Sequence, residues 1–268
     1  MNARTFLING LVAGLLGGLV AFVVALGVGE PAIEDAIALE ESASASAPTD
    51  DHAHTEGEAE DGHSHSHDED TEGITRGQQA GPGLATATVL IGAVLGGLVG
   101  IASAFAVGRF GRLSPVATTA LVAGAGFVAV VLVPWLKYPP NPPAVGSGDT
   151  IGERTALYFG FLAISVLAVV AAVIVARQVL AVRSAWTATI VGGAVYALVV
   201  GVAVAVMAPI DEVPDSFPSN VLFEFRVGSL LTQGALWLAL GIVLTGLVHR
   251  AWAQERADVA RREAAAAL

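Results

Sequence analysis

The sequence has 268 residues, of which 54% are hydrophobic and 14% are charged, and it contains no cysteine. Soluble domains carry about 25% charged residues, so this composition excludes a soluble globule, and the lack of thiols excludes disulfides and thiolate metal sites. The net charge of −11 arises in segment 30–83, which carries −14 and leaves +3 for the rest of the chain, so it gives no reason to expect a nucleic-acid partner.

Six segments contain no Asp, Glu, Lys, Arg or His, and each is at least 22 residues long. About 20 apolar residues in a helix cross a hydrocarbon core about 30 Å thick. Six blocks of this length in so short a chain are too many for the buried helices of a soluble core. We therefore predict an all-α polytopic membrane protein, a bundle of about six transmembrane helices. The segments are 6–29, 84–108, 113–136, 155–176, 184–210 and 227–248.

The first transmembrane helix is predicted over residues 1–29. Its apolar run is longer than the core of a signal peptide, about 7–15 residues, and no clear cleavage site follows, so we expect the helix to be retained. Glycines recur every four residues in this helix and in the next, a spacing that lets backbones approach closely within a membrane. These glycines, which predict that the two helices pack together, are Gly10, Gly14, Gly18, Gly92, Gly96 and Gly100.

Residues 30–83 are predicted to form an extracytoplasmic, acidic and His-rich loop. Within it, residues 32–41 are expected to form a short helix on the membrane surface. Residues 42–73 have almost no apolar side chains. They cannot offset the entropy lost on ordering, so we expect this part to be disordered without a ligand.

Five of the six histidines lie in this loop among carboxylates. Imidazole binds Co, Ni, Cu and Zn, and carboxylates help to hold a divalent cation. Because its ligands must be unprotonated, such a site should be exchangeable and lost as pH falls. A solvated acidic spacer with incidental histidines is the alternative, but their confinement to one segment favours metal capture. The candidate metal ligands are His52, His54, His63, His65, His67, Asp51, Asp61 and Asp68.

A five-helix transmembrane region is predicted over residues 84–250. Two proline-rich loops, 137–154 and 208–226, fall on the same side as the acidic loop. No ionisable side chain lies well inside any predicted helix, where proton relays and coupling-ion sites are usually found. The candidate permeation-path residues are therefore neutral, and hydrogen bonding between packed helices is their alternative role. They are Asn141, Thr232 and Gln233.

The basic residues predict the orientation. Nine arginines fall on the side of the two termini, and four basic residues fall on the opposite side. Because positive charge is retained in the cytoplasm, we predict a multi-pass protein of the cell membrane with both termini cytoplasmic and a cytoplasmic tail over 251–268. The tryptophans lie mostly near predicted span ends, as interfacial aromatics do. The four basic residues on the outer side are Arg76, Lys137, Arg154 and Arg226.

No motif indicates an enzyme. The sequence lacks HExxH, GxSxG and P-loop patterns, and no pair of acids or histidines lies in the membrane to act as general acid and base. The Glu153-Arg154 and Glu224-x-Arg226 pairs at outer helix starts are expected to be interfacial anchors or ion pairs. We expect no catalysis and no tightly bound cofactor.

A glycine-rich first helix and an acidic His/Asp/Glu loop are followed by three longer motifs. These are PWLKYPPNPPAVG at 134–146, DTIGERT at 149–155 and FRVGSLLTQ at 225–233. Together they resemble the CbtA family of predicted cobalt transporter subunits over most of the chain. The resemblance implies cobalt uptake linked to cobalamin supply, and a small single-helix, His-bearing partner like CbtB.

The predicted function is that of a membrane subunit of a divalent metal uptake transporter, for Co²⁺, with the outer loop collecting the ion. The alternative is a non-transporting membrane subunit that senses metal or acts as a scaffold, which the lack of interior charge favours. The expected partners are the lipid bilayer and the CbtB-like protein, and assembly into an oligomer is left open.

Overall fold

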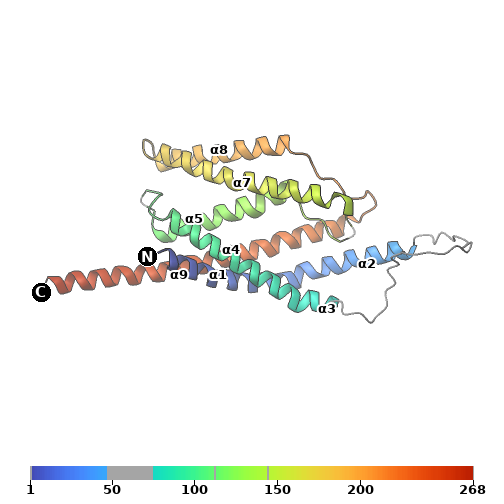
Figure 1. Cartoon of the computed structure of the whole chain (residues 1–268), viewed down its shortest axis with the longest axis horizontal. Coiled ribbons are helices and arrows are strands. Elements are labelled where there is room, and N and C mark those ends of the chain that lie inside the picture. Colours follow the sequence, from blue (N-terminus) through green and yellow to red (C-terminus); the bar gives the residue numbers. More distant parts are fainter. Residues whose placement is uncertain (1, 47–74, 112, 144, 268) are drawn as a thin grey trace, which may run out of the picture.

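The computed structural model describes residues 2–46, 75–111, 113–143 and 145–267, and all regular elements in these residues are helices (Figure 1). Six helical segments are long and apolar enough to cross a membrane, which confirms the predicted multi-pass helical architecture. The elements are α1 (Ala3–Val24), η1 (Ala25–Gly29), α2 (Glu30–Ser46), α3 (Arg76–Gln78), η2 (Gln79–Gly83), α4 (Leu84–Ala106), α5 (Pro115–Phe127), η3 (Val128–Leu132), α6 (Val133–Lys137), η4 (Gly148–Thr150), α7 (Ile151–Leu180), α8 (Ala185–Val206) and α9 (Ser219–Ala266).

Three of the spans contain a π-helical turn, η1, η2 and η3. Pro82 lies within η2 and Pro134 is the second residue after η3, and a proline removes a regular i→i−4 hydrogen bond. The π turns keep each helix continuous, so α2 continues α1 as one helical segment. The helix expected over 32–41 is present, but it continues α1 and extends to Ser46, into the part expected to be disordered. Glu30–Ser46 is rich in alanine and glutamate, which favour helix, and its proline lies in the first turn, where proline is tolerated.

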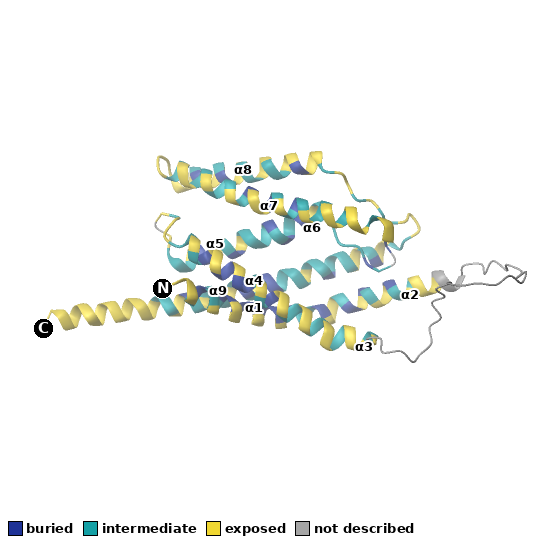
Figure 2. Ribbon diagram, in the orientation of Figure 1, coloured by how far each residue is buried: buried dark blue, intermediate teal, exposed yellow. Residues whose placement is uncertain are grey.

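The core of the bundle lies where α1 crosses α4 and α9 (Figure 2). The glycine faces of α1 and α4 pack backbone to backbone, as their spacing predicts. A Cβ at Gly14 would lie 2.8 Å from the carbonyl carbon of Gly92, and one at Gly96 would lie 2.7 Å from the Cα of Gly14. Beside this glycine face, Gly17 of α1 lies against the backbone of α9 at Leu236. Small residues therefore let three helices meet closely.

Helices α7 and α8 form a hairpin beside this core (Figure 1). The two helices are joined by a hydrogen bond of 2.9 Å between the hydroxyls of Ser165 and Tyr196. Large apolar side chains elsewhere on the bundle face outward, as contact with lipid requires; Leu98, Phe105, Leu167, Leu198 and Leu238 are each more than half exposed.

Both termini lie at one end of the bundle, and α9 extends beyond the other helices there (Figure 1). The opposite end, called here the loop end, carries α2, α3 and the loops that follow α6 and α8. The acidic segment therefore leaves and re-enters the bundle at the same end as the two proline-rich loops.

Candidate functional site: a cavity at the loop end

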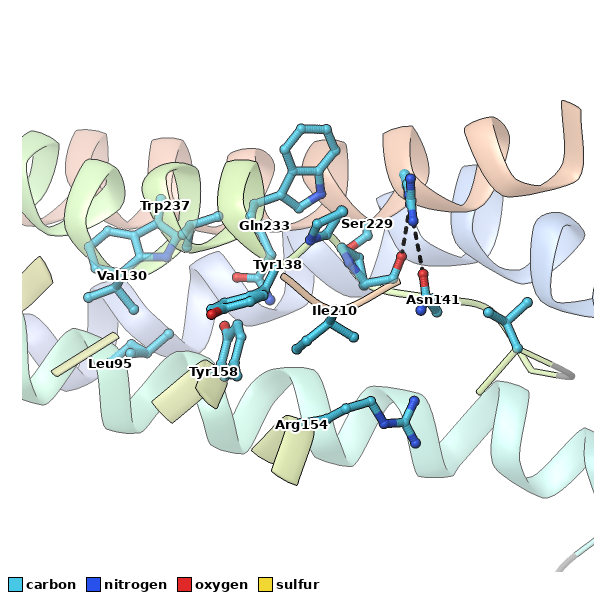
Figure 3. A pocket seen from close by; sticks show the side chains of 16 residues that line it. Leu95, Val130, Tyr138, Asn141, Arg154, Tyr158, Ile210, Ser229, Gln233 and Trp237 are labelled. Atoms are coloured by element: carbon cyan, nitrogen blue, oxygen red, sulfur yellow. Dashed lines mark hydrogen bonds between the residues drawn. The ribbon is translucent and has the colours of Figure 1, made fainter. Parts of the chain in front are cut away.

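A cavity of about 470 Å³ lies toward the loop end, between α4, α6, α7, α9 and the two proline-rich loops (Figure 3). Its volume is within the range of ordinary small-molecule sites, about 300–1,000 Å³. Leu95, Val130 and Trp237 line one end of it, and Asn141 and Arg154 lie toward the other (Figure 3). The cavity therefore has an apolar part and a polar part.

One face of α9 forms a wall of the cavity. Arg226, Ser229, Gln233 and Trp237 all line it, and their spacings of three, four and four residues place them on one side of a helix. At about 1.5 Å per residue, the eleven steps from Arg226 to Trp237 extend about 16 Å, half the thickness of a hydrocarbon core of about 30 Å. The cavity therefore follows α9 from the loop end to the middle of its apolar segment.

The basic residues at the loop end are each bound to other groups. Lys137 Nζ donates to the carbonyl oxygens of Val204 at 3.1 Å and Met207 at 3.0 Å, where the helix dipole at the end of α8 favours a cation. Arg76 forms an ion pair with the buried Glu30. This pair joins α3 to the start of α2, on either side of the acidic segment.

Arg154 pairs with a carboxylate that is distant in sequence. Its Nη1 lies 3.0 Å from Glu212 Oε2, so the ion pair expected here forms with Glu212 in the second proline-rich loop. Gly146 allows the approach, because a Cβ there would collide with both side chains and its φ of +105° favours glycine. The pair ties the two loops together at the mouth of the cavity.

Arg226 has only neutral partners. Its Nε donates to the carbonyl oxygen of Pro140 at 3.3 Å, and its Nη2 donates to Asn141 Oδ1 at 2.9 Å, which are the dashed lines in Figure 3. Within the described residues, Arg226 lies in no ion pair with a carboxylate, Glu224 included. Its charge is therefore not neutralised at the cavity wall.

Several buried donors at the cavity lack an acceptor within the described part of the chain. They are Trp135 Nε1, Trp237 Nε1 and Arg154 Nε. Trp237 is 4% exposed and its ring centroid lies 6.4 Å from that of Phe127, so this side chain packs inside the bundle. By contrast, burial raises the pKa of Tyr138, whose protonated phenol donates to the carbonyl oxygen of Ala208 at 2.8 Å.

The charge of the cavity lining does not suit a bare cation. The lining contains Arg154 and Arg226 and no carboxylate, and Glu212 offsets only one of these charges. A divalent ion about 6 Å from a guanidinium would be repelled by about 5 kcal/mol at an effective dielectric constant of about 20. In the residues that the structure describes, no group of three His, Asp or Glu could hold a metal ion.

The candidate metal ligands predicted from the sequence lie outside the described residues. They are His52, His54, His63, His65, His67, Asp51, Asp61 and Asp68. Of the three candidate permeation-path residues, Asn141 and Gln233 line the same cavity and Thr232 does not. Sequence reasoning did not assign Trp135, Tyr158, Arg226, Ser229 or Trp237 to a site. The repeated three- and four-residue spacing of polar groups in α9 is the signal that points to the last three.

A family model described as "Probable cobalt transporter subunit (CbtA)" matches residues 3–249. The match therefore includes all six membrane-spanning segments, from near the start of α1 to the end of the apolar part of α9. No curated protein and no solved structure matches the chain.

Proposed function

The chain belongs to the CbtA family of cobalt transporter subunits, and from this premise we propose that it takes part in Co²⁺ uptake, with the loop end outside the cell and both termini in the cytoplasm. The unequal distribution of basic residues supports this orientation, because eight of those that the structure describes lie toward the termini and four toward the loop end. These four are all engaged in ion pairs or hydrogen bonds, which gives each of them a structural role on the outer side.

The observation that carries the proposal is the cavity along α9. A transport protein needs a solvent-accessible route into the membrane, and this cavity extends about 16 Å along the last span from the loop end. The acidic segment with its five histidines leaves the bundle at the same end. We propose that this segment collects Co²⁺ and that the cavity is the entrance, with Asn141 and Gln233 on the path. Because the lining repels a bare divalent ion, Co²⁺ would enter the cavity together with anionic ligands that offset its charge.

Membership of this family also bears on the partner protein and on the role of Co²⁺. One subunit of a transporter works together with others, and we propose a small single-helix, His-bearing protein like CbtB as the partner. Co²⁺ is the transported substrate in this account, and no catalytic step is needed.

Uptake of radioactive cobalt tests the proposal. Cells that express the chain with its small partner should accumulate Co²⁺ above cells that carry an empty vector. Deletion of residues 50–70 should reduce uptake at low cobalt and spare it at saturating cobalt, because the segment raises the local ion concentration without forming the path. Loss of uptake at every concentration would instead place the segment in the path itself.

A second function is favoured by a specific observation. The cavity carries an excess positive charge, and the described residues contain no preformed cation site, as expected for a protein that senses metal or acts as a scaffold without conducting it. The uptake experiment separates the two functions. Absence of cobalt accumulation both with and without the small partner would favour the non-transporting role.

A further inference from the structure

We infer that the cavity binds a small organic anion through a carboxylate group, with Arg226 as its charge partner. The inference concerns the cavity alone and goes beyond cobalt uptake. A bound carboxylate would pair with the Arg226 guanidinium, which has no carboxylate partner, and would offer acceptors to the unpaired indole N–H groups of Trp135 and Trp237 in the same cavity.

Arg226 has unused capacity to bind an anion. A guanidinium has five N–H donors, and the described structure uses two of them, one on Pro140 and one on Asn141. Carboxylates match the guanidinium fork with two parallel hydrogen bonds. The contacts with Pro140 and Asn141 hold the side chain beside the cavity, so it is positioned in advance for a ligand.

The unpaired groups deeper in the cavity are also donors. Buried polar groups in native proteins are nearly always hydrogen-bonded, yet the indole N–H groups of Trp135 and Trp237 have no acceptor in the described chain. Figure 3 shows Gln233 between Trp237 and Asn141 along the cavity, and no hydrogen bond of its side chain occurs within the described residues. A lining rich in donors and free of carboxylates selects a ligand rich in acceptors.

The apolar part of the lining favours an organic ligand over a hydrated inorganic ion. Leu95, Val130 and Ile210 contribute aliphatic surface, and Tyr158 contributes an aromatic side chain. Apolar walls with a few placed polar groups are typical of small-molecule sites. A body of several carbon atoms with one or more carboxylates fits this division.

The inference also bears on transport, and in this consequence it rests on the proposed function. The complex of Co²⁺ with a tricarboxylate carries a net charge of −1. The Arg226 guanidinium, which repels the bare ion, would therefore attract the complex. A free carboxylate would bind in the same place. The ligand class can therefore be tested without metal and without transport.

Tryptophan fluorescence gives a local readout, because the chain has four tryptophans and two of them line the cavity. In a W186F/W252F background, purified protein in nanodiscs of zwitterionic lipid is titrated with citrate at constant ionic strength. We expect a saturable change. R226Q should weaken binding about 10-fold or more, because it removes hydrogen bonds from a charged donor. R183Q, at an exposed position near the other end of the bundle, should change binding less than about 2-fold.

A second variant covers the case in which R226Q disturbs the loop. Q233L leaves the contacts of Arg226 with Pro140 and Asn141 intact and should weaken citrate binding about 2- to 10-fold. No saturable response to citrate, or equal binding in wild type, R226Q and Q233L, would overturn the inference. In the variant that lacks residues 50–70, a response to ZnCl₂ alone would make the cavity a cation site. Binding of inorganic phosphate as tight as citrate would make it an inorganic anion site. Both outcomes overturn the inference. Citrate binding without cobalt uptake would leave the inference standing and contradict only the transport function.

Discussion

The contact between α1 and α4 gives the most quantitative prediction, for the substitution Gly14→Ala. The added Cβ would lie 2.8 Å from the carbonyl carbon of Gly92 and 3.0 Å from the Cα of Ala93. These are backbone atoms, so no change of rotamer relieves the overlap and the two helices must separate. Overpacking of this kind costs about 1–3 kcal/mol. Because the overlap is with backbone atoms, we take the upper part of this range, about 2–3 kcal/mol. The better helix propensity of alanine returns about 1 kcal/mol, which leaves a net loss of about 1–2 kcal/mol.

Gly193→Ala is the matched control, because Gly193 lies within the α8 span and a Cβ there meets nothing within 4 Å. Thermal unfolding in detergent, followed by the helical circular dichroism signal, measures both variants. Gly14→Ala should lower Tm by about 2–8 °C, and Gly193→Ala should leave it unchanged or raise it slightly. Equal Tm values for the two variants would refute the assignment of backbone contact between α1 and α4.

Two further substitutions test the ion pairs at the loop end. Gly146→Ala should destabilise the fold by about 1–3 kcal/mol, because it strains a backbone with φ of +105° and displaces Arg154 from Glu212; an unchanged Tm would contradict this. Glu30→Gln should cost about 1–3 kcal/mol because it leaves the Arg76 guanidinium without its carboxylate, and limited proteolysis should then cut the adjoining segment 47–74 faster than in wild type.

The sequence was sufficient to predict the number of spans and one of their contacts. A run of at least 22 residues without ionisable side chains has few stable environments other than the bilayer core, and all six such runs are helical spans. The four-residue glycine spacing also predicted that α1 packs on α4. The π turns were not predicted, nor was the continuation of α1 into α2. The prolines near η2 and η3 do not by themselves identify a π turn, and η1 contains no proline.

The site was predicted less completely, for geometric reasons. Adjacent residues of a helix point about 100° apart, so the sequence could not tell whether Thr232 or Gln233 faces the cavity, and only Gln233 does. The environment of Arg226 depends on Asn141, which is 85 residues away in the sequence. Contacts over such distances are set by helix packing and are not visible in local patterns. The proposed metal ligands of the acidic segment lie outside the described residues and stay a prediction.

The chain has no cysteine, so a single introduced thiol can test whether the cavity is the outer entrance for cobalt. Ser229 lines the cavity, and Ala260 is exposed on the terminal part of α9. Intact cells that express S229C or A260C together with the small partner protein are treated with a membrane-impermeant thiol reagent, and radioactive cobalt uptake and the extent of labelling are measured together.

We predict that S229C is labelled and that its uptake falls to the level of cells without the chain, whereas A260C stays unlabelled and active. Complete labelling of S229C with undiminished uptake would contradict the account, as would labelling of A260C alone.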